Sequence, residues 1–335
     1  MGLKKILVTG GAGFIPSSLI DRLLEDSENY IVAVDNLLTG YTHNMPMSAT
    51  NFRFIKANVN KWDDLSSIMT STSFDYVFHY AAVVGVKLTL DKPLMVLDDM
   101  KGIENILRLS KNTGVKRVFF SSSSEVYGEP VEFPQNEFTT PLNSKLPYAI
   151  VKNIGEAYLK SFHHEHGLNY TIFRFFNTYG PKQGNQFVIS KFLNAALRNE
   201  DILINGNGSQ TRTFCYIDDN IDATIECLYK DKFINDVVNM GSEKEITVLD
   251  LANLIKSLTG SSSRIIHVPP LKEGDMKRRQ PDNTKMKELL HHDLLPLEAG
   301  IHKILKNWTK KDYPLTEIEN SPITSKVEIE EMQEK

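Results

Sequence analysis

The sequence predicts an α/β protein with a Rossmann-type, doubly wound parallel sheet and a smaller C-terminal α/β lobe. Two observations support this fold class. Short apolar strands alternate with helical patterns through the first half of the 335 residues, which is typical of a parallel sheet covered by helices on both faces. A glycine-rich turn, Gly10 to Gly13, follows the first strand and leads directly into the first helical pattern.

The predicted strands are short apolar runs bounded by turn residues. Ile6 to Thr9 is the first strand, and the helix after the glycine turn is expected to run to about Glu25. Further strands are predicted at residues 31–35, 52–57, 75–80 and 117–123, and those at 171–175 and 237–240 are expected to return to the same sheet. Beyond about Phe176, Gly-Pro, Asn-Gly and Pro-Pro pairs separate shorter elements.

The composition limits the classes of function. The chain has 41% hydrophobic and 24% charged residues and a formal net charge of -4, which is typical of a globular protein and argues against binding to nucleic acid. Cys215 and Cys227 form no CxxC pair, so a reducing compartment is expected. Met1 to Val8 is too short for a secretory signal, and no apolar run is long enough to cross a bilayer. We therefore expect a soluble, cytoplasmic protein.

The glycine turn and the second strand predict a dinucleotide site. Gly10 and Gly13 let the backbone approach a pyrophosphate, and the following helix N-terminus offers free N–H groups. Asp35 ends the second strand, where a carboxylate accepts hydrogen bonds from a ribose and repels a 2′-phosphate. No arginine follows it, so NAD is expected rather than NADP. Pro16 replaces the third glycine of the usual turn, and its bulk is expected to shift the helix slightly.

Tyr148 and Lys152 form the second informative motif. They are four residues apart, so they share one face of a predicted helix and their polar ends can converge. A phenol beside an ammonium group, placed next to a nicotinamide, suits proton and hydride transfer at an alcohol carbon.

Together with further motifs, these residues resemble the extended short-chain dehydrogenase/reductase family, and within it the nucleotide-sugar epimerases, dehydratases and decarboxylases. The resemblance runs from Ile6 to about Trp308. Its motifs are Thr9–Ile15 (TGGAGFI), Ser122–Gly128 (SSSEVYG), the Tyr148/Lys152 pair, Phe176–Pro181 (FNTYGP), Gly208–Arg212 (GSQTR) and Arg279–Asp282 (RQPD). The resemblance implies an enzyme that binds NAD and a nucleotide-diphosphate sugar, and a homodimer formed through the helix that carries Tyr148.

The resemblance also implies roles for single residues. Tyr148 would be the general base on the hexosyl C4 hydroxyl, its pKa lowered by Lys152 and the nicotinamide; Ser123 would bond the same oxygen, and Lys152 the nicotinamide ribose. The cofactor contacts expected are Gly10, Gly13, Phe14, Ile15, Asp35, Asn36, Asn58, Val59, Ala81, Ala82, Tyr148 and Lys152. The substrate contacts expected are Lys87, Ser124, Lys145, Asn177, Arg212 and Arg279. Of these, Asn177, Arg212 and Arg279 would contact the diphosphate. Asn58 and Asp99 replace an aspartate and an asparagine that are usual in the family.

Glu125 bears on the fate of the 4-keto sugar, because a carboxylate there can remove the C5 proton that the ketone makes acidic. In the family, a Ser/Thr-Ser-Glu run occurs in UDP-glucuronate decarboxylases and GDP-mannose 4,6-dehydratases. Dehydratases of dTDP-glucose usually have aspartate at the position of Ser124, and simple 4-epimerases usually lack the glutamate. The decarboxylases have arginine at the position of Lys145. Lysine keeps the positive charge there, but its ammonium cannot form the bidentate hydrogen bonds that a guanidinium makes to a carboxylate.

We therefore expect C4 oxidation followed by 4,6-dehydration or C6 decarboxylation. A 4-epimerase, a 4-dehydrogenase that releases the 4-keto sugar and NADH, and a non-catalytic NAD-binding sensor stay open as alternatives.

The expected organisation has an NAD-binding domain at 1–176 and a substrate lobe at 177–315, interleaved with strands of the main sheet. A mobile polar tail is expected at 316–335. His163, His164 and His166 precede Gly167 at a predicted helix end, where they favour the helix dipole. No metal site is expected, because adjacent residues do not share a helix face.

Overall fold

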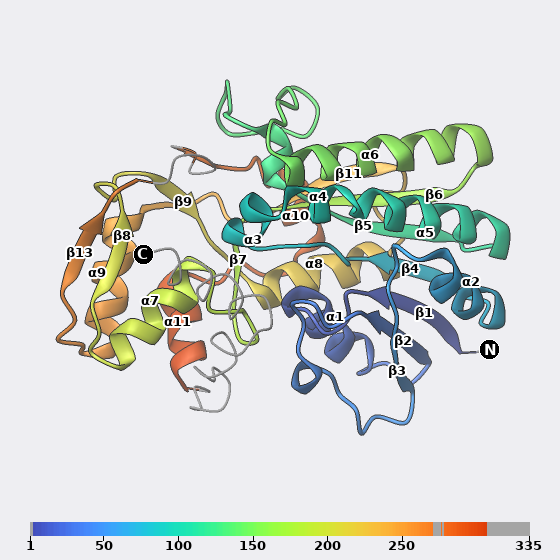
Figure 1. Ribbon diagram of the computed structural model, residues 1–335, viewed down its shortest axis with the longest axis horizontal. Helices are drawn as coiled ribbons and strands as arrows, with labels where there is room; N and C mark the ends of the chain where they lie inside the picture. Colours follow the sequence, from blue (N-terminus) through green and yellow to red (C-terminus); the bar gives the residue numbers. More distant parts are fainter. Residues whose placement is uncertain (1–2, 271–275, 277, 307–335) are drawn as a thin grey trace, which may run out of the picture.

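The centre of the protein is a seven-stranded parallel sheet with the strand order β11-β6-β5-β4-β1-β2-β3 (Figure 1). The computed structural model describes residues 3–270, 276 and 278–306. The strands of this sheet are β1 (Lys4–Thr9), β2 (Asn29–Asp35), β3 (Phe52–Lys56), β4 (Tyr76–His79), β5 (Arg117–Ser123), β6 (Asn169–Phe175) and β11 (Asp236–Met240). The predicted Rossmann-type fold is confirmed, and the strands expected to return, β6 and β11, pair with each other at one edge.

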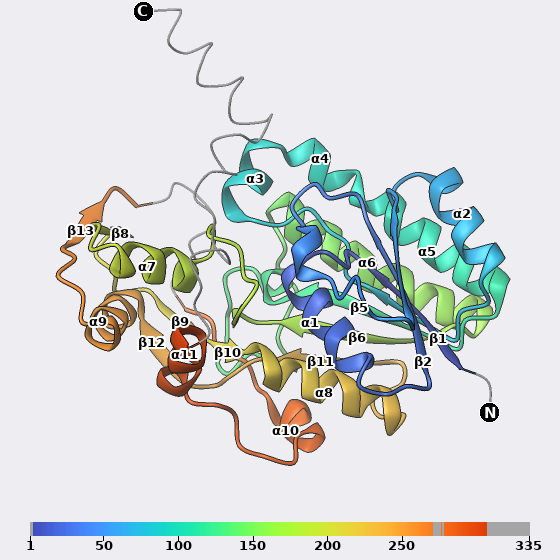
Figure 2. The ribbon, with the colours of Figure 1, turned by 90° about the horizontal axis from the view of Figure 1, so that it is seen from below.

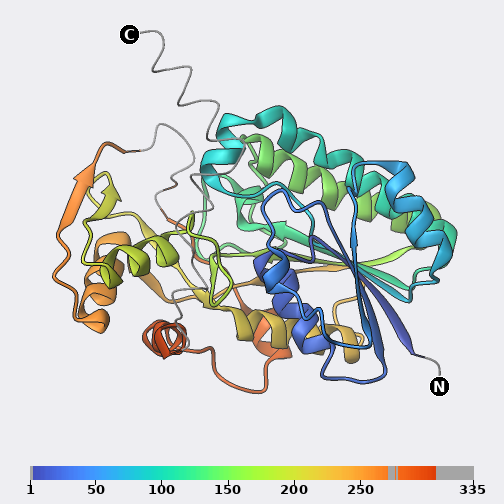
Figure 3. The same cartoon turned by 60° about the horizontal axis from the view of Figure 1, so that its bottom comes forward.

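Helices cover both faces of the sheet (Figure 3). One face carries α1 (Phe14–Leu23) and α8 (Ile217–Tyr229), and the other carries α2 (Trp62–Ser71), α5 (Asp99–Thr113) and α6 (Pro147–His166). Successive strand residues point to opposite faces, so Ile6 and Val8 pack in one core cluster while Leu7 packs in the other. Two buried cores therefore hold the sheet rigid between its helices.

Helix α6 begins and ends at the residues its sequence predicts. Pro147 occupies the first turn, where its missing N–H costs nothing. Gly167 caps the C-terminus in the left-handed conformation with φ 69°. His163, His164 and His166 lie in the last turn, so the predicted position of these histidines is confirmed. Helix α1 ends at Leu23, slightly before the predicted Glu25.

The second lobe contains shorter elements at one end of the sheet (Figure 2). Its pairs of strands are β8 (Ile202–Asn205) with β13 (Ile265–Val268), and β9 (Thr211–Thr213) with β12 (Glu245–Thr247). Its helices are α7 (Val188–Leu197), α9 (Val248–Thr259) and α11 (Leu297–Lys306). Between the lobe and the sheet lie β7 (Thr178–Tyr179) and β10 (Cys215–Tyr216), which pair in parallel, and α10 (Thr284–Leu289) contacts α8 and β11.

A buried ionic network ties α6 to the strands below it. The Arg174 guanidinium on β6 donates to both carboxylate oxygens of Glu156 at 2.9 and 2.7 Å. Ser122 of β5 donates to the same carboxylate at 2.6 Å, and Arg174 also donates to the Tyr127 hydroxyl at 2.8 Å. Only 2% of Arg174 and 1% of Glu156 is exposed. Since Glu156 lies one turn after Lys152, the network fixes α6 against the end of β5.

Within the described residues, no helix is long and apolar enough to span a membrane. The predicted tail, 316–335, lies outside the described residues. Cys215 and Cys227 are buried and free.

Candidate active site

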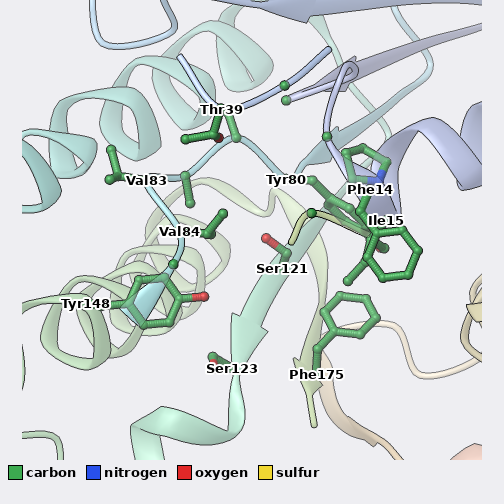
Figure 4. A pocket seen from close by; sticks show the side chains of 18 of the residues that line it. Phe14, Ile15, Thr39, Tyr80, Val83, Val84, Ser121, Ser123, Tyr148 and Phe175 are labelled. Atoms are coloured by element: carbon green, nitrogen blue, oxygen red, sulfur yellow. The ribbon is translucent and has the colours of Figure 1, made fainter. Parts of the chain in front are cut away.

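A cavity of about 410 Å³ lies at the carboxyl ends of the central strands (Figure 4). Its walls come from the turn after β1, the ends of β2, β4, β5 and β6, and the start of α6. Strands β1 and β4 are neighbours in the sheet, and the chain leaves them in opposite directions. Ligands of open parallel sheets bind at such a switch point.

The glycine turn forms one wall of the cavity. Gly10 has φ +70°, and a Cβ there would lie 2.8 Å from the backbone of Ala81, so only glycine fits. Gly13 caps the N-terminus of α1 without a side-chain hydrogen bond, which leaves helix N–H groups available to an anion. Pro16 is the third residue of α1 and lines the same cavity. The backbone therefore suits the pyrophosphate of a dinucleotide.

Asp35 lies at the end of β2, on the floor of this part of the cavity. Its carboxylate accepts hydrogen bonds from the Ala12 N–H at 3.0 Å and the Leu37 N–H at 2.7 Å. Burial raises the pKa of Asp35, and these two hydrogen bonds oppose the rise. Each oxygen has a further lone pair, so the carboxylate can accept from ribose hydroxyls. The residues present fit a dinucleotide without a 2′-phosphate.

Tyr148, Lys152 and Ser123 converge at the other end of the cavity. The Tyr148 ring projects from the start of α6 and points its hydroxyl toward the strand that carries Ser121 and Ser123 (Figure 4). The Lys152 ammonium is buried, donates to the Ser121 hydroxyl at 3.3 Å and lies over the Phe120 ring. The Ser123 hydroxyl accepts from the Glu125 N–H at 3.2 Å.

The acid–base balance of this group differs from the sequence-based expectation. Burial raises the pKa of Tyr148, the charge of Glu125 raises it further, and the Ser123 side chain opposes the rise. The sequence analysis expected Lys152 to lower the pKa of Tyr148. In the structure the pKa is raised instead, because the effect of burial is the largest. Burial lowers the pKa of Lys152 to about 8, against the opposing charge of Asp99.

Glu125 and Arg279 form an ion pair in the cavity wall. The Arg279 guanidinium donates to the Glu125 carboxylate at 2.6 Å and to the Ser124 hydroxyl at 3.1 Å. Arg279 is nearly inaccessible while Glu125 keeps about a quarter of its side chain exposed. Arg279, from the second lobe, therefore contacts the residues that follow the carboxyl end of β5.

Most of the predicted site residues share this one cavity. The predicted residues that line it are Gly10, Gly13, Phe14, Ile15, Asp35, Asn36, Asn58, Val59, Ala81, Ala82, Ser123, Ser124, Glu125, Tyr148, Lys152, Asn177 and Arg279. Lys145 is exposed and Arg212 half-buried, and neither is among the lining residues. The side chain of Lys87, in α3 (Val86–Asp91), lies outside the described part of the structure.

The cavity also contains residues that the sequence analysis did not select. Ser121, Thr39 and Gln186 line it, and so does Asp99, which the sequence marked only as a departure from its relatives. The serine run on β5 is a signal that could have identified Ser121, since alternate residues of a strand share a face. Over the described ranges, no group of three or more histidine, cysteine or acidic side chains could hold a metal ion.

Comparison with known proteins identifies the family. Residues 6–241 match the family model of the NAD dependent epimerase/dehydratase family. The chain belongs to this family. Membership confirms the resemblance inferred from the motifs, the enzyme class and the expectation of NAD as cofactor.

Individual relatives differ in their reactions. The chain is 34% identical over 317 residues to UDP-N-acetyl-alpha-D-glucosaminuronate decarboxylase from Bacillus cytotoxicus, covering 90% of this chain and 97% of the relative. A crystal structure of UDP-glucose 4-epimerase with UDP-glucose from Thermotoga maritima is 34% identical, with a TM-score of 0.84 and coverage of 90% and 99%. UDP-glucuronic acid 4-epimerase from Bacillus cereus, in complex with UDP-glucuronic acid and NAD, is 28% identical with a TM-score of 0.81 and coverage of 91% and 100%.

Proposed function

We propose that this protein binds a nucleotide-diphosphate sugar beside NAD, oxidises its C4 hydroxyl to a ketone, and then changes the 4-keto sugar at C5 and C6 by dehydration or decarboxylation. The observation that carries the proposal is the convergence of Ser123, Tyr148, Lys152 and Glu125 on one cavity whose other end is built for a dinucleotide. NAD, when bound, accepts a hydride from the sugar.

The chain's own residues handle the proton of the C4 hydroxyl. Tyr148 accepts it as general base in its tyrosinate form and becomes neutral tyrosine, and the buried Lys152 ammonium stabilises that tyrosinate before the transfer. Ser123 orients the same hydroxyl by a hydrogen bond. The ion-pair network of Glu156 and Arg174 keeps α6 against β5, and thereby fixes the position of these groups.

Glu125 is the residue we assign to the second step. Its carboxylate keeps an accessible portion in the cavity, and oxidation at C4 makes the C5 hydrogen acidic. Removal of that proton by Glu125 and its transfer to the departing C6 hydroxyl release water and leave a C5–C6 double bond. Uptake of the hydride removed from C4 at C6, and of a proton at C5, would then complete the dehydrated 4-keto sugar. In a uronic acid substrate, loss of carbon dioxide replaces this step, and C5 then takes up a proton.

A 4-epimerase is the second candidate, and the contact between Glu125 and Arg279 favours it. The Arg279 guanidinium holds the Glu125 carboxylate at 2.6 Å, and an oxygen engaged in that contact is not free to take the C5 proton. If Arg279 keeps Glu125 engaged throughout the reaction, the 4-keto sugar is reduced again from its other face and no atom is lost.

The substrate lobe is assigned to residues 177–315, with the NAD-binding domain at 1–176. Asn177 and Arg279 supply polar contacts at the border of the two parts, and an arginine fork suits phosphate oxygens. We also propose that Arg212, Lys145 and Lys87 contact the substrate, which a structure with bound nucleotide sugar would test. By resemblance to the family, we also propose a cytoplasmic homodimer, which sedimentation at several concentrations tests.

Mass spectrometry of reaction mixtures distinguishes these functions. The protein is incubated with NAD and a panel of UDP-, GDP- and dTDP-hexoses and UDP-hexuronic acids. Loss of water identifies a 4,6-dehydratase, and loss of carbon dioxide identifies a decarboxylase. An isomer of unchanged mass identifies an epimerase, and loss of two hydrogens with NADH identifies a dehydrogenase. Absence of turnover over the whole panel contradicts the proposal and favours a sensor.

A further inference from the structure

Asp99 is a half-buried acid in the wall of the active-site cavity. It is the first residue of α5 and lines the cavity together with Tyr148 and Lys152. Its carboxylate accepts hydrogen bonds from the Val83 N–H at 2.7 Å and from the Asn60 side-chain amide at 3.2 Å. These two donors hold the carboxylate in place, but they are neutral, and a carboxylate partly removed from water is stabilised by a compensating charge.

Lys152 is a cation that lines the same cavity as Asp99, and the helices that carry the two residues, α6 and α5, pack against each other. No direct ion pair to Asp99 exists among the described side chains. Burial raises the pKa of Asp99, and the charge of Lys152 opposes that rise. Burial lowers the pKa of Lys152, and the charge of Asp99 opposes that fall. The other ionisable groups around Lys152 are Tyr148 on its own helix and His79 on β4. His79 is buried and neutral, with a pKa lowered to about 3, so it supplies no charge.

We propose that Asp99 is the counter-charge of Lys152 across the cavity, and that it acts as a positioning residue that keeps the ammonium protonated while Tyr148 exchanges its proton. The role in catalysis rests on the function proposed above. The electrostatic coupling does not, because it can be measured without substrate.

The charge of Asp99 matters because Lys152 is buried. Burial lowers the pKa of Lys152 to about 8, and Asp99 opposes this effect. Without the Asp99 charge the pKa falls further, so a larger share of Lys152 is neutral near pH 7. A neutral lysine cannot stabilise a tyrosinate, and turnover is then lost at the alkaline end of the pH range.

The substitution Asp99→Asn removes this charge with little change of shape. The Oδ1 atom of Asn60 is buried and has no hydrogen-bond partner within the described chain. Rotation of the Asn60 amide would turn that oxygen toward position 99, where the new amide nitrogen can donate to it. The Val83 N–H keeps its acceptor. Asp99→Glu is the complementary variant, because it keeps the charge and alters the packing.

The test is a pH titration of Lys152 by NMR of the side-chain nitrogen, in the 335-residue chain with and without NAD. The Lys152→Met variant assigns the signal. We expect Asp99→Asn to lower the titration midpoint of Lys152 by about half a pH unit or more, and Asp99→Glu to leave it near the parent value. Asp91→Asn is the control, since Asp91 is exposed.

Two outcomes overturn the proposal. One is an unchanged midpoint in a folded Asp99→Asn protein, and the other is an equal shift in Asp99→Asn and Asp99→Glu, which indicates a packing effect. Should Asp99→Asn fail to fold, Asp99→Ser provides the same comparison. Where a substrate is identified, the alkaline limb of the pH–rate profile should move to lower pH in Asp99→Asn. A shifted midpoint without turnover supports the coupling while contradicting the proposed function.

Discussion

The Glu125 carboxylate, at the end of the strand that carries Ser123, is paired with the Arg279 guanidinium 154 positions later in the chain at 2.6 Å. This contact places a potential base and a cation side by side at the sugar end of the cavity. The role of Glu125 distinguishes a dehydratase from an epimerase, because dehydration requires Glu125 as a base and epimerisation does not.

Glu125→Gln should therefore separate the two steps. For a dehydratase, C4 oxidation continues and NADH accumulates, while the final product falls by about a factor of 10². A decarboxylase needs no base for the C5 proton, so its product should fall much less. Single-turnover absorbance of NADH and mass spectrometry of the sugar measure the two steps. Glu129→Gln is the control, since Glu129 is exposed on the same segment. Unchanged product formation in Glu125→Gln would remove Glu125 from the mechanism.

Tyr148→Phe should abolish the first step. Loss of a general base lowers turnover by about 10²–10⁴-fold, while NAD binding stays close to that of the parent because the glycine turn and Asp35 are untouched. Turnover and NAD titration by fluorescence check both expectations. Tyr158→Phe, on the same helix and packed against Phe162, is the matched control. Activity within a few-fold of the parent would contradict the assignment of Tyr148.

Asp35→Ala should weaken NAD binding and relax the discrimination against NADP. A hydrogen bond to a charged group contributes about 1.5–3 kcal/mol, so NAD affinity should fall by about 10- to 100-fold. The NADP affinity should change less, because its 2′-phosphate no longer meets a carboxylate. Calorimetric titration with both cofactors measures the ratio, with Asp63→Ala as an exposed control. A ratio equal to that of the parent would place the ribose elsewhere.

The buried pair of Glu156 and Arg174 should contribute strongly to the stability of the protein around α6. Removal of one partner leaves the other charge buried and costs about 3–5 kcal/mol, so Glu156→Gln should lower the free energy of unfolding by about that amount. Denaturant titration measures it. The exposed pair of Asp201 and Arg264 is the comparison, and Asp201→Asn should leave stability nearly unchanged. Equal effects of both substitutions would contradict the importance of the buried network.

The buried His79 should make the free energy of unfolding depend on pH. Thr9 Oγ1 accepts hydrogen bonds from the Tyr80 and Ala81 N–H groups, so its own hydrogen is free to point to His79 Nδ1, 2.9 Å away. This arrangement needs neutral histidine. Burial, and then the charge of Lys152, lower the pKa of His79 from 6.5 to about 3. The unfolded chain therefore binds the extra proton, and stability falls as the pH drops from 6.5 toward 3.

The parent should accordingly lose about 1.4 kcal/mol per pH unit more than His79→Gln within this window. Denaturant unfolding at a series of pH values measures the difference, and the exposed His164→Gln substitution is the control. Identical pH slopes for parent and His79→Gln would show that His79 is not held neutral by the fold.

The sequence predicted those parts of the site that depend on local geometry. Gly10, Gly13 and Asp35 follow from a strand–turn–helix pattern, and Tyr148 with Lys152 follows from helical spacing. These positions depend on short stretches of backbone, which local patterns determine.

Contacts between distant segments could not be predicted in the same way. Arg279 was expected at the diphosphate, but its ion pair with Glu125 depends on how the second lobe packs against β5. Lys145 has the right charge for a substrate contact, yet in the structure it is exposed and does not line the cavity. Likewise, the sequence showed Asp99 only as a departure from the family. Its role could not be predicted, because its partners Val83 and Asn60 come from other parts of the chain.

The central claim is that the C4 hydrogen of a nucleotide sugar leaves as hydride in the cavity that contains Tyr148. The most direct test uses the substrate identified by the panel, labelled with deuterium at C4, in a quenched single turnover. We predict that mass spectrometry finds the deuterium in the reduced cofactor for the Glu125→Gln protein, and finds none there for Tyr148→Phe. Reduced cofactor that carries no deuterium in the Glu125→Gln protein, while the 4-keto sugar forms, would contradict the account.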